Sequence, residues 1–584
     1  MSSKHFINDP THLVLSALKS ITLTNPTTAL DSENKVIYLR PDAAKPQVSL
    51  VSGGGSGHEP SFAAFVGPGL LSGAVAGTIF ASPSAEQIRR CILERVETSK
   101  GVLVVVMNYT GDVLNFGMAV EKAKAAGMSV EMVVMGDDAG VGRARGGKVG
   151  RRGIAGTVLV HKIAGALAAT GASLKDVHKV AQLVADNTVS IGSSLSHVHV
   201  PGRDKGEADE LKEDEVEIGM GIHNEPGSEK TTADLPAIVK TMLKYMLDPE
   251  DKDRAFLSVS KSDETVLLVN NLGGVSVLEM GGITNEVVTQ LSETHGIKPV
   301  RIISGTFMTS LNGLGFSISL LKIQDSGVGK SILELLDAPA ECSGWAAAVS
   351  SNTWAKPPTE TREKGAGAGV ENKPCGLSLD PQLATKALKQ ALERVIKAEP
   401  DITRYDTVVG DGDCGIGLKR GAEGIMEHID GAQQEKDAAL YLDRIISIVE
   451  NTMDGTSGAL YAIFLNALAH GLRSQGGSSD TQADAQVWAK ALSIAMQSMG
   501  KYTPAQPGDR TLVDALAPFV EQLGASGDVQ KAAQAAEQGS KNTKGMKASL
   551  GRTVYIGGSG YEEVPDPGAH GLAEFFSGLA EGLR

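Results

Sequence analysis

Hydrophobic positions in the first part of the chain come in short runs of strand length. Residues 47–52, 102–107 and 130–135 are rich in β-branched or apolar side chains, and each run is stopped by Gly, Asp or Asn. Residues 84–100 and 115–126 lie between these runs and have the length of helices. Continuous apolar strands that alternate with helices predict an α/β layered domain with a largely parallel sheet.

The next part of the chain repeats this kind of pattern. Residues 156–170 and 174–191 are predicted to be successive helices. A helix over 275–294 is then expected among further strands, which are predicted at 216–222, 265–270, 300–303 and 316–321. These elements predict a second α/β subdomain that begins near residue 195. The charge-dense residues 204–215 are interpreted as a solvated loop.

The pattern changes again near residue 345. Residues 351–373 contain almost no apolar side chain, which is typical of an interdomain linker. Beyond residue 380 helical periodicity dominates, over 381–398, 415–429, 436–452, 459–472, 481–499, 511–523, 529–541 and 571–583. We therefore predict an α/β module over 1–344, a linker over 345–378 and an all-α module over 379–584.

Composition narrows the class of protein. The 584-residue chain has a net charge of −14, which argues against nucleic-acid binding as its main function, although residues 143–152 (RARGGKVGRR) form a local basic stretch. The four cysteines are far apart and form no CxxC pair, so we expect a reducing compartment, the cytoplasm. Neither a secretory signal nor an apolar run of about 18 residues is visible, so no membrane association is expected.

The densest candidate chemistry lies in residues 406–417, DTVVGDGDCGIG. Asp406, Asp411 and Asp413 are separated by glycines. Carboxylates this close repel one another unless a hard cation such as Mg²⁺ neutralises them, and glycines let backbone amides approach an anion. The segment does not fit an EF-hand, because Ala422 stands at the twelfth position from Asp411. An ordinary polar turn remains the alternative to a metal–phosphate site on a loop that opens a helix.

Further glycine-marked segments precede predicted helices in the same module. They include 455–458 (GTSG), 507–511 (PGDRT) and 566–568 (DPG), and Arg552 follows a glycine. Helix N-termini of this kind bind phosphates. No GxxxxGK[ST] sequence occurs, so a P-loop nucleotide site is excluded.

In the α/β module, three polar side chains follow predicted strands. His58 comes after the glycine-rich residues 51–57, Asp112 follows the strand at 102–107, and His223 lies among glycines in 219–227. Taken singly, a histidine is more often structural and a strand-end aspartate is often a helix cap. Together they predict a polar pocket in which histidine serves as a proton-transfer group or a nucleophile.

These motifs, taken in order, resemble those of the single-chain, ATP-dependent dihydroxyacetone kinases of fungi and animals. The resemblance runs nearly end to end and is carried by GGGSGHEP, NYTGDV, GIHNEPG, GDGDCG, GTSGA, PGDRT and DPGAHG. It implies a substrate-binding α/β module joined by a polar linker to an all-α helical barrel that binds ATP. It also implies a cytoplasmic homodimer in which the α/β module of one chain faces the helical module of the other.

For the α/β module, the resemblance implies that His223 forms a covalent hemiaminal with the ketone carbon of dihydroxyacetone. His58 and Asp112 would then position the reacting hydroxyl and handle its proton, with D-glyceraldehyde as a further substrate. The implied substrate-binding residues are Gly55, Ser56, Gly57, His58, Met107 and Asp112. Met107 departs from the family pattern, because some relatives have lysine there, and altered substrate affinity is the expected consequence.

For the helical module, the resemblance implies that Asp406, Asp411 and Asp413 hold two Mg²⁺ ions against the phosphates of ATP. The residues implied to line ATP are Cys414, Gly415, Ile416, Gly417, Thr456, Ser457, Gly500, Leu512, Arg552, Asp566, Pro567 and Gly568. Cys414 stands where bacterial relatives usually have histidine. Two alternatives remain at this point: an FMN cyclase (FAD-AMP lyase) activity, which some animal relatives have, and a non-catalytic ligand-binding regulator.

Overall fold

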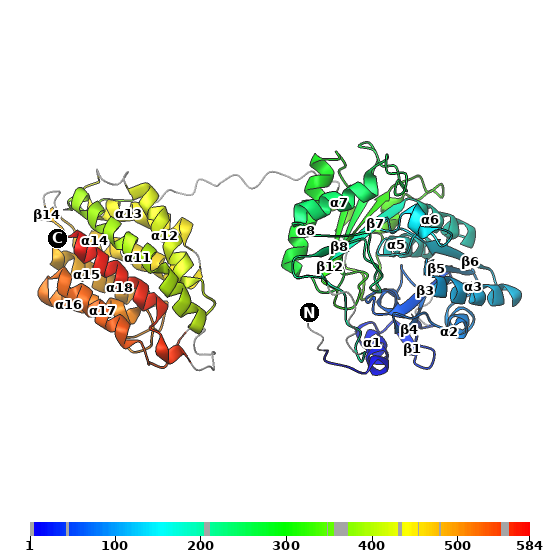
Figure 1. Cartoon of the computed structure of the whole chain (residues 1–584), viewed down its shortest axis with the longest axis horizontal. Coiled ribbons are helices and arrows are strands. Elements are labelled where there is room, and N and C mark those ends of the chain that lie inside the picture. The colour runs from blue at the N-terminus through cyan, green and yellow to red at the C-terminus, as the bar shows by residue number, and fades with distance from the viewer. Residues whose placement is uncertain are drawn as a thin grey trace. The chain divides into compact units, whose positions relative to one another are not determined.

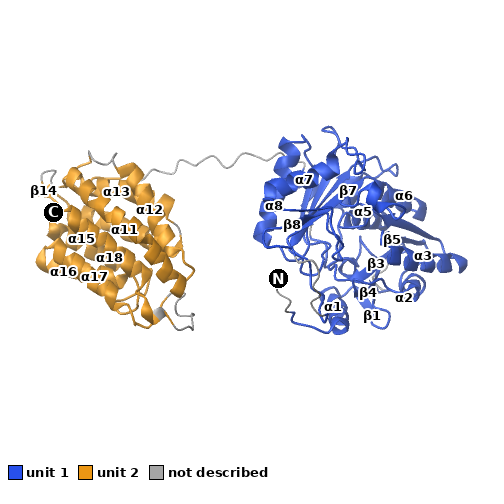
Figure 2. Cartoon of the chain, viewed as in Figure 1, with its two compact units in different colours: residues 1–361 blue, residues 362–584 orange. Residues whose placement is uncertain are grey.

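The computed structural model describes residues 5–41, 46–203, 211–346, 349–354, 372–429, 435–453, 455–477, 481–550 and 560–584. The chain divides into two compact units, Met1–Thr361 and Arg362–Arg584 (Figure 2). Within the described residues, no helix combines the length and the apolar character that a membrane span requires. An α/β unit followed by a helical unit confirms the predicted fold class.

The first sheet of unit 1 has the strand order β1-β2-β4-β3-β5-β6. Its strands are β1 (Thr28–Asp31), β2 (Val36–Leu39), β3 (Ser49–Ser56), β4 (Gly73–Ile79), β5 (Val102–Met107) and β6 (Val130–Met135). The four strands β4, β3, β5 and β6 run parallel, and β1 and β2 complete the sheet with antiparallel pairings. The largely parallel sheet expected from the continuous apolar runs is therefore present.

The second sheet has the strand order β11-β10-β12-β7-β8-β9, and only β10 and β11 pair in parallel. Its strands are β7 (Thr188–Ser194), β8 (Val216–Ile218), β9 (Glu229–Thr231), β10 (Thr265–Asn271), β11 (Arg301–Gly305) and β12 (Gly315–Lys322). The predicted helix over 174–191 is wrong at its end, because α6 stops at Asp186. The next residues have alternating β-branched side chains and pair with β12, with Val189 opposite Leu320 and Ile191 opposite Ile318.

Helices cover both sheets of unit 1 (Figure 1). The helices of unit 1 are α1 (Pro10–Thr24), α2 (Ala85–Arg90), α3 (Thr110–Ala125), α4 (Arg143–Gly146), α5 (Thr157–Ala169), α6 (Leu174–Asp186), α7 (Leu235–Leu247), α8 (Val277–Glu293), α9 (Ile332–Asp337) and α10 (Ser351–Trp354). The predicted helix over 84–100 is shorter than expected, because α2 passes into a π-helical turn at Cys91–Arg95.

Helix α5 is the centre of unit 1. Its sequence TVLVHKIAGALAA is apolar on nearly every side, which is typical of a helix that is buried all round. Its side chains share one hydrophobic core with residues of both sheets, such as Leu103 of β5 and Leu268 of β10. The core therefore fixes the two sheets relative to one another, and with them the loops at their ends.

Unit 2 is a closed ring of antiparallel helices in which each helix contacts the next in sequence and α11 contacts α18. The helices are α11 (Pro381–Val409), α12 (Cys414–His428), α13 (Ala438–Thr452), α14 (Gly455–Gln475), α15 (Ala485–Met499), α16 (Val513–Ser526), α17 (Val529–Asn542) and α18 (Pro567–Gly582). A short two-stranded pairing joins β13 (Leu377–Ser378) to β14 (Thr481–Gln482). Because the helices alternate in direction, α12, α14, α16 and α18 all begin at the same end of the barrel.

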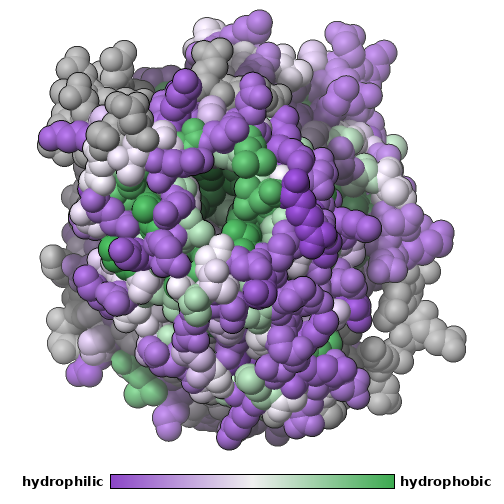
Figure 3. All heavy atoms as spheres, turned by 90° about the vertical axis from the view of Figure 1, so that its left-hand side faces the viewer, coloured by the Kyte–Doolittle hydropathy of each residue, from purple (hydrophilic) through white to green (hydrophobic). Residues whose placement is uncertain are grey.

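The barrel encloses an apolar cavity of about 440 Å³. Apolar side chains from every barrel helix, α11 to α18, line it, including Leu388, Leu465, Phe576 and, from α17, Val529. The face of unit 2 turned to the viewer in Figure 3 is hollowed, and hydrophobic residues surround the opening.

Replacing either of two helical glycines of unit 1 with alanine is expected to change stability in opposite directions. A Cβ atom at Gly165 in α5 would lie 2.5 Å from the Leu70 carbonyl oxygen, whereas a Cβ atom at Gly281 in α8 would meet nothing within 4 Å. We expect Gly165→Ala to lower the free energy of unfolding of unit 1 by about 1–3 kcal/mol through overpacking. Gly281→Ala should raise it by up to about 1 kcal/mol through helix propensity. Chemical denaturation of both variants would check this; equal effects would contradict the close approach at Gly165.

Candidate active site

The polar residues of unit 1 meet at the carboxyl end of the first sheet. β3 pairs in parallel with β4 on one side and with β5 on the other. The strands that follow β3 in sequence therefore lie on opposite sides of it, which makes the end of β3 a topological switch point. Such a switch point is where open α/β sheets bind ligands. His58 follows β3, Phe80 follows β4, and Asp112 lies in the first turn of α3, directly after β5.

His223 comes from the second sheet, in the loop after β8, and its ring meets His58. The two Nε2 atoms lie 3.0 Å apart. The neighbouring backbone also joins the subdomains, because the Leu311 amide donates to the Gly57 carbonyl and the Thr309 amide donates to the His58 carbonyl. The structure therefore brings His58 and His223 together, as the sequence predicted from two separate motifs.

The hydrogen-bond partners fix where the protons of this pair lie. His58 Nδ1 lies 2.8 Å from the Thr309 carbonyl oxygen, which can only accept, so this nitrogen carries a proton. His223 Nδ1 lies 2.9 Å from a carboxylate oxygen of Glu225 and carries a proton for the same reason. The two facing Nε2 atoms then share one further proton, which makes the pair cationic and leaves Glu225 to balance the charge.

Electrostatics assigns that shared proton. Burial, together with the charge of His223, lowers the pKa of His58 to about 3, so His58 is neutral before substrate binds and can hold a proton only transiently. With its proton on Nδ1, His58 presents Nε2 as an acceptor toward Nε2 of His223. Burial disfavours the charged form of Glu225, but hydrogen bonds from His223 and the charges of His223 and Arg152 outweigh burial, and the pKa of Glu225 falls to about 2. Glu225 thus stays ionised beside His223.

Aromatic rings enclose the histidine pair. The Phe80 ring stacks on His58 with centroids 5.3 Å apart, and Phe80 and Tyr109 each meet the His223 ring edge-on. Phe80, Asn224 and Leu311 have positive φ angles of 59°, 65° and 50°. Non-glycine residues in this region are strained, and such strain gathers at functional sites.

Asp112 is a buried carboxylate of the same site. Burial raises its pKa, although a hydrogen bond from Ser82 and the charge of His223 act against that rise. Its Oδ1 atom has no hydrogen-bond partner among the described residues, and Gly54 lies directly beside the carboxylate. A carboxylate with a raised pKa and a vacant acceptor position is suited to receive a proton from a bound ligand.

The other predicted residues of unit 1 occupy different surroundings. Gly55 and Ser56 end β3, with the Ser56 hydroxyl donating to the Gly77 carbonyl. The Gly57 amide donates to the Glu59 carboxylate at 3.0 Å, and a Cβ atom at Gly57 would lie 2.7 Å from the Phe80 ring. Met107 is buried in the hydrophobic core with 1% of its surface exposed. Its proposed contact with substrate stays a prediction.

In unit 2, the three predicted aspartates gather where α11 ends and α12 begins. Oxygen atoms of Asp406, Asp411 and Asp413 all lie within 4.8 Å of one another. Asp406 lies in the last turn of α11 rather than in the expected loop, because α11 continues through Pro400 to Val409. Three convergent carboxylates fit a hard divalent cation.

Further groups surround this cluster. Asp406 Oδ2 accepts a hydrogen bond from the Cys414 amide at 3.0 Å, and Cys414 Sγ lies 3.9 Å from the Ser457 hydroxyl. Asp566 caps α18 and is electrostatically coupled to Asp406. Burial raises the pKa of Asp566 to about 7, and the nearby Asp514 and Asp406 carboxylates add to this rise. These groups lie where four helix N-termini converge, and that positive dipole end favours phosphate.

The remaining predicted residues of unit 2 divide by environment. Gly415 is a packing residue, because a Cβ atom there would lie 2.3 Å from the Thr403 hydroxyl of α11. Arg552 lies outside the described residues. The others lie at helix ends around the cluster: Ile416 and Gly417 in the first turn of α12, Thr456 in that of α14, Gly500 after α15, Leu512 before α16, and Pro567 and Gly568 at the start of α18.

Sequence reasoning missed several residues of the first site. Glu225 is the most important, and its only sequence signal is its position two residues after His223 in a glycine-bounded loop. Phe80 and Tyr109 follow strands, but aromatic residues at strand ends are too common to be informative. Thr309 contributes its backbone carbonyl, which no side-chain pattern reveals.

Comparison with known proteins gives these two sites a context. A family model described as the Dak1 domain matches residues 19–344, and one described as the DAK2 domain matches residues 408–581. The chain is therefore a fusion of these two domain types. Dihydroxyacetone kinase 1 of Saccharomyces cerevisiae is 46% identical over 600 residues, covering 100% of both chains. The chain belongs to the dihydroxyacetone kinase family.

Two further relatives bear on function. The protein named triokinase/FMN cyclase of Homo sapiens is 36% identical over 605 residues, covering 100% of both chains. The crystal structure of the dihydroxyacetone kinase from C. freundii in complex with AMP-PNP and Mg²⁺ matches with a TM-score of 0.65 and 32% identity. That match covers 99% of this chain and 100% of the other.

The assignment of the aspartate cluster as a metal site can be tested without measuring catalytic turnover. We expect Mg²⁺ to raise the stability of unit 2, by about 2.7 kcal/mol when its concentration is 100 times the dissociation constant. Asp413→Asn should weaken this effect by removing one carboxylate. Thermal unfolding of the full chain against Mg²⁺ concentration measures the effect. Asp401→Asn, at an exposed aspartate paired with Arg404 on the same helix, is the control. Equal Mg²⁺ responses in both variants would refute the metal assignment.

Proposed function

We propose that this chain is an ATP-dependent kinase that phosphorylates dihydroxyacetone, and D-glyceraldehyde as a second acceptor. The observation that carries the proposal is the Glu225–His223–His58 chain of hydrogen bonds in a full-length member of the dihydroxyacetone kinase family. The D-glyceraldehyde activity is supported by the relatives named triokinase.

In the proposed mechanism, His223 binds the substrate covalently as a hemiaminal. Nε2 of His223 passes its proton to His58, 3.0 Å away, and its lone pair attacks the ketone carbon. The carbonyl π electrons move to oxygen, which takes the proton from His58, so no outside proton is needed. The imidazolium that results keeps its Nδ1 proton against Glu225, and this carboxylate balances the charge.

Phosphoryl transfer then requires a hydroxyl of the tethered substrate to attack the γ-phosphate of ATP. The proton of that hydroxyl passes to Asp112, and the bond from the γ-phosphorus to the bridging oxygen breaks to release ADP. Asp406, Asp411 and Asp413 would hold two Mg²⁺ ions, which neutralise phosphate charge when bound. The amides at the starts of α12, α14 and α18 would bind the phosphates of ATP.

We further propose that two copies of the chain form a dimer in which the acceptor site of one chain works with the ATP site of the other. The long polar segment between the modules, predicted from the sequence, supports this arrangement because a linker of this length would allow unit 2 of one chain to reach the acceptor site of another. Phosphoryl transfer needs both sites within bonding distance and shielded from water.

A coupled assay for ADP release tests the function. We expect turnover with dihydroxyacetone in the wild-type chain, and its loss by about 100-fold or more in His223→Ala, because the tether that orients the hydroxyl is gone. Glycerol, which has no carbonyl group, should compete better with dihydroxyacetone in His223→Ala than in the wild type. His12→Ala, at an exposed position in α1, is the control. Absence of wild-type turnover would refute the function, and unchanged selectivity would refute the hemiaminal.

Mixing two inactive variants tests the arrangement of chains. His223→Ala disables the acceptor site and Asp411→Ala disables the metal site. If the sites work between chains, each mixed dimer contains one complete site. Subunit exchange should then restore roughly a quarter of the wild-type rate, since half of the dimers are mixed and each has one working site of two. A mixture that stays inactive after verified exchange would show that each chain acts alone.

A further inference from the structure

The basic stretch 143–152, which the proposed function leaves unexplained, makes its contacts within the chain. Arg143 donates to the carbonyl oxygens of Lys252 and Ala255, and its guanidinium lies over the Phe256 ring. Arg151 also lies over that ring, at 4.2 Å from its centroid. Arginines whose donors are used internally are poorly suited to bind a nucleic acid or another external anion.

Two other arginines of this stretch reach the loop that carries His223. We call residues Gly219 to Gly227 the catalytic loop. Arg152 donates to the Gly219 carbonyl at 2.7 Å, at the start of the loop. Arg145 donates to the Pro226 and Gly227 carbonyls at 2.9 and 2.7 Å, at its end. The two guanidinium groups therefore hold both ends of the loop between which His223 and Glu225 lie.

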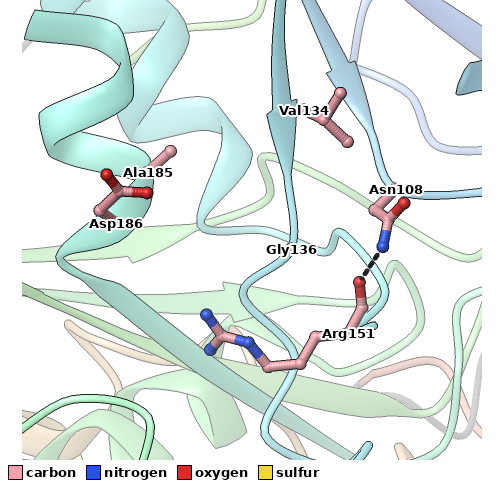
Figure 4. A pocket seen from close by; sticks show the side chains of 6 residues that line it. All are labelled: Asn108, Val134, Gly136, Arg151, Ala185 and Asp186. Carbon is pink, nitrogen blue, oxygen red and sulfur yellow. Dashed lines mark hydrogen bonds between the residues drawn. The ribbon is translucent and has the colours of Figure 1, made fainter. Parts of the chain in front are cut away.

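The arginines are themselves held in place. Arg152 forms an ion pair of 2.7 Å with Asp138, whose side chain is 1% exposed and follows β6. The Asn108 side chain donates to the Arg151 carbonyl at 2.7 Å and to the Val149 carbonyl at 2.8 Å, which ties the basic stretch to the end of β5. Figure 4 shows the bond from Asn108 to the Arg151 backbone at the wall of a pocket of about 300 Å³.

The catalytic loop needs such support because it has little of its own. Glycines occupy positions 219, 221 and 227, and Gly219 and Asn224 have positive φ angles. Within the loop, the Gly221 amide donates to the Glu225 carbonyl and the His223 amide donates to the Glu225 carboxylate. A glycine-rich segment loses much conformational entropy on ordering, so outside contacts must fix the position of His223. Ser310 and Val198 hold its neighbours Ile222 and Asn224, and the arginines hold the two ends of the loop.

We propose that Arg145 and Arg152 are positioning residues that clamp the catalytic loop and so set the place of His223 and Glu225 for the acceptor reaction. This inference rests on the proposed function for its catalytic consequence, but the clamp itself is a property of the folded chain. Arg152 has a second effect, because its charge favours the ionised form of Glu225, which also faces His223, His58 and Tyr109.

Arg145→Ala in the full-length protein tests the clamp. We expect faster amide hydrogen exchange in peptides covering 219–227, because local opening becomes easier. In the coupled assay, kcat/KM for dihydroxyacetone should fall by about 10- to 100-fold, since a displacement of about 1 Å in a reacting group can cost 100-fold. The KM for ATP should stay within about twofold of the wild-type value. Lys148→Ala, an exposed cation in the same stretch, should change none of these quantities.

Substitutions of Arg152 provide a second test of the clamp. Arg152→Met should lower kcat/KM further than Arg152→Lys, because lysine keeps the positive charge and loses only the planar guanidinium group with its paired N–H donors. Loss of the cation raises the pKa of Glu225, so the acid limb of the kcat/KM profile should move to higher pH in Arg152→Met alone. Arg152→Met leaves Asp138 unpaired and puts folding at risk, and for that reason the exposed Arg145 decides the question.

The results of these experiments test the proposed clamp independently of the proposed function. Unchanged exchange over 219–227 and unchanged kcat/KM in Arg145→Ala would overturn the clamp. A wild-type chain without dihydroxyacetone turnover would overturn the proposed function, while the exchange measurement would still decide the clamp.

Discussion

The acceptor site depends on one contact, the pair of Nε2 atoms of His58 and His223. Each histidine belongs to a different sheet, so the 3.0 Å distance exists only while both subdomains keep their relative position. That position is maintained by the core around α5, which takes side chains from both sheets, and by the backbone bonds from Thr309 and Leu311 to the His58 segment. Packing remote from the site therefore determines its proton chemistry, because the shared proton needs both rings in contact.

The two sites differ in the sign of the charge that has to be balanced. In unit 1, one buried proton is confined between two imidazoles and balanced by Glu225, whose carboxylate is surrounded by His223 and by the charge of Arg152. In unit 2, oxygen atoms of three carboxylates converge within 4.8 Å of one another. Burial raises the pKa of Asp406, and the charges of Asp413 and Asp411 add to this rise. A bound divalent cation would relieve that repulsion, so the same residues that destabilise unit 2 supply its affinity for metal.

Sequence patterns predicted the elements better than the contacts between them. The α/β and all-α modules follow from periodicity, and His58, His223 and the aspartate cluster follow from glycine-bounded motifs. The first four residues of the strand at Thr188–Ser194 were assigned to a helix, because their alternation merges with the preceding amphipathic segment and only the pairing with β12 separates the two. Strand β4 (GAVAGTI) was missed because small residues carry little hydrophobic signal. Glu225 and the arginine contacts were missed because they depend on tertiary geometry, which a single sequence does not encode as a local pattern.

Helix direction explains why a phosphate site can form without a P-loop. In an antiparallel ring every second helix starts at the same end, so α12, α14, α16 and α18 direct their first-turn amides, which have no partner within the helix ladder, toward one region. A P-loop concentrates several amides and a lysine in one turn. This barrel instead distributes single helix starts around its rim and places Asp406 among them, at the end of α11, where the dipole is negative. The negative helix end and the carboxylates favour a cation, while the adjacent helix starts favour an anion. A metal-bound phosphate satisfies both, whereas either ion alone would satisfy only one.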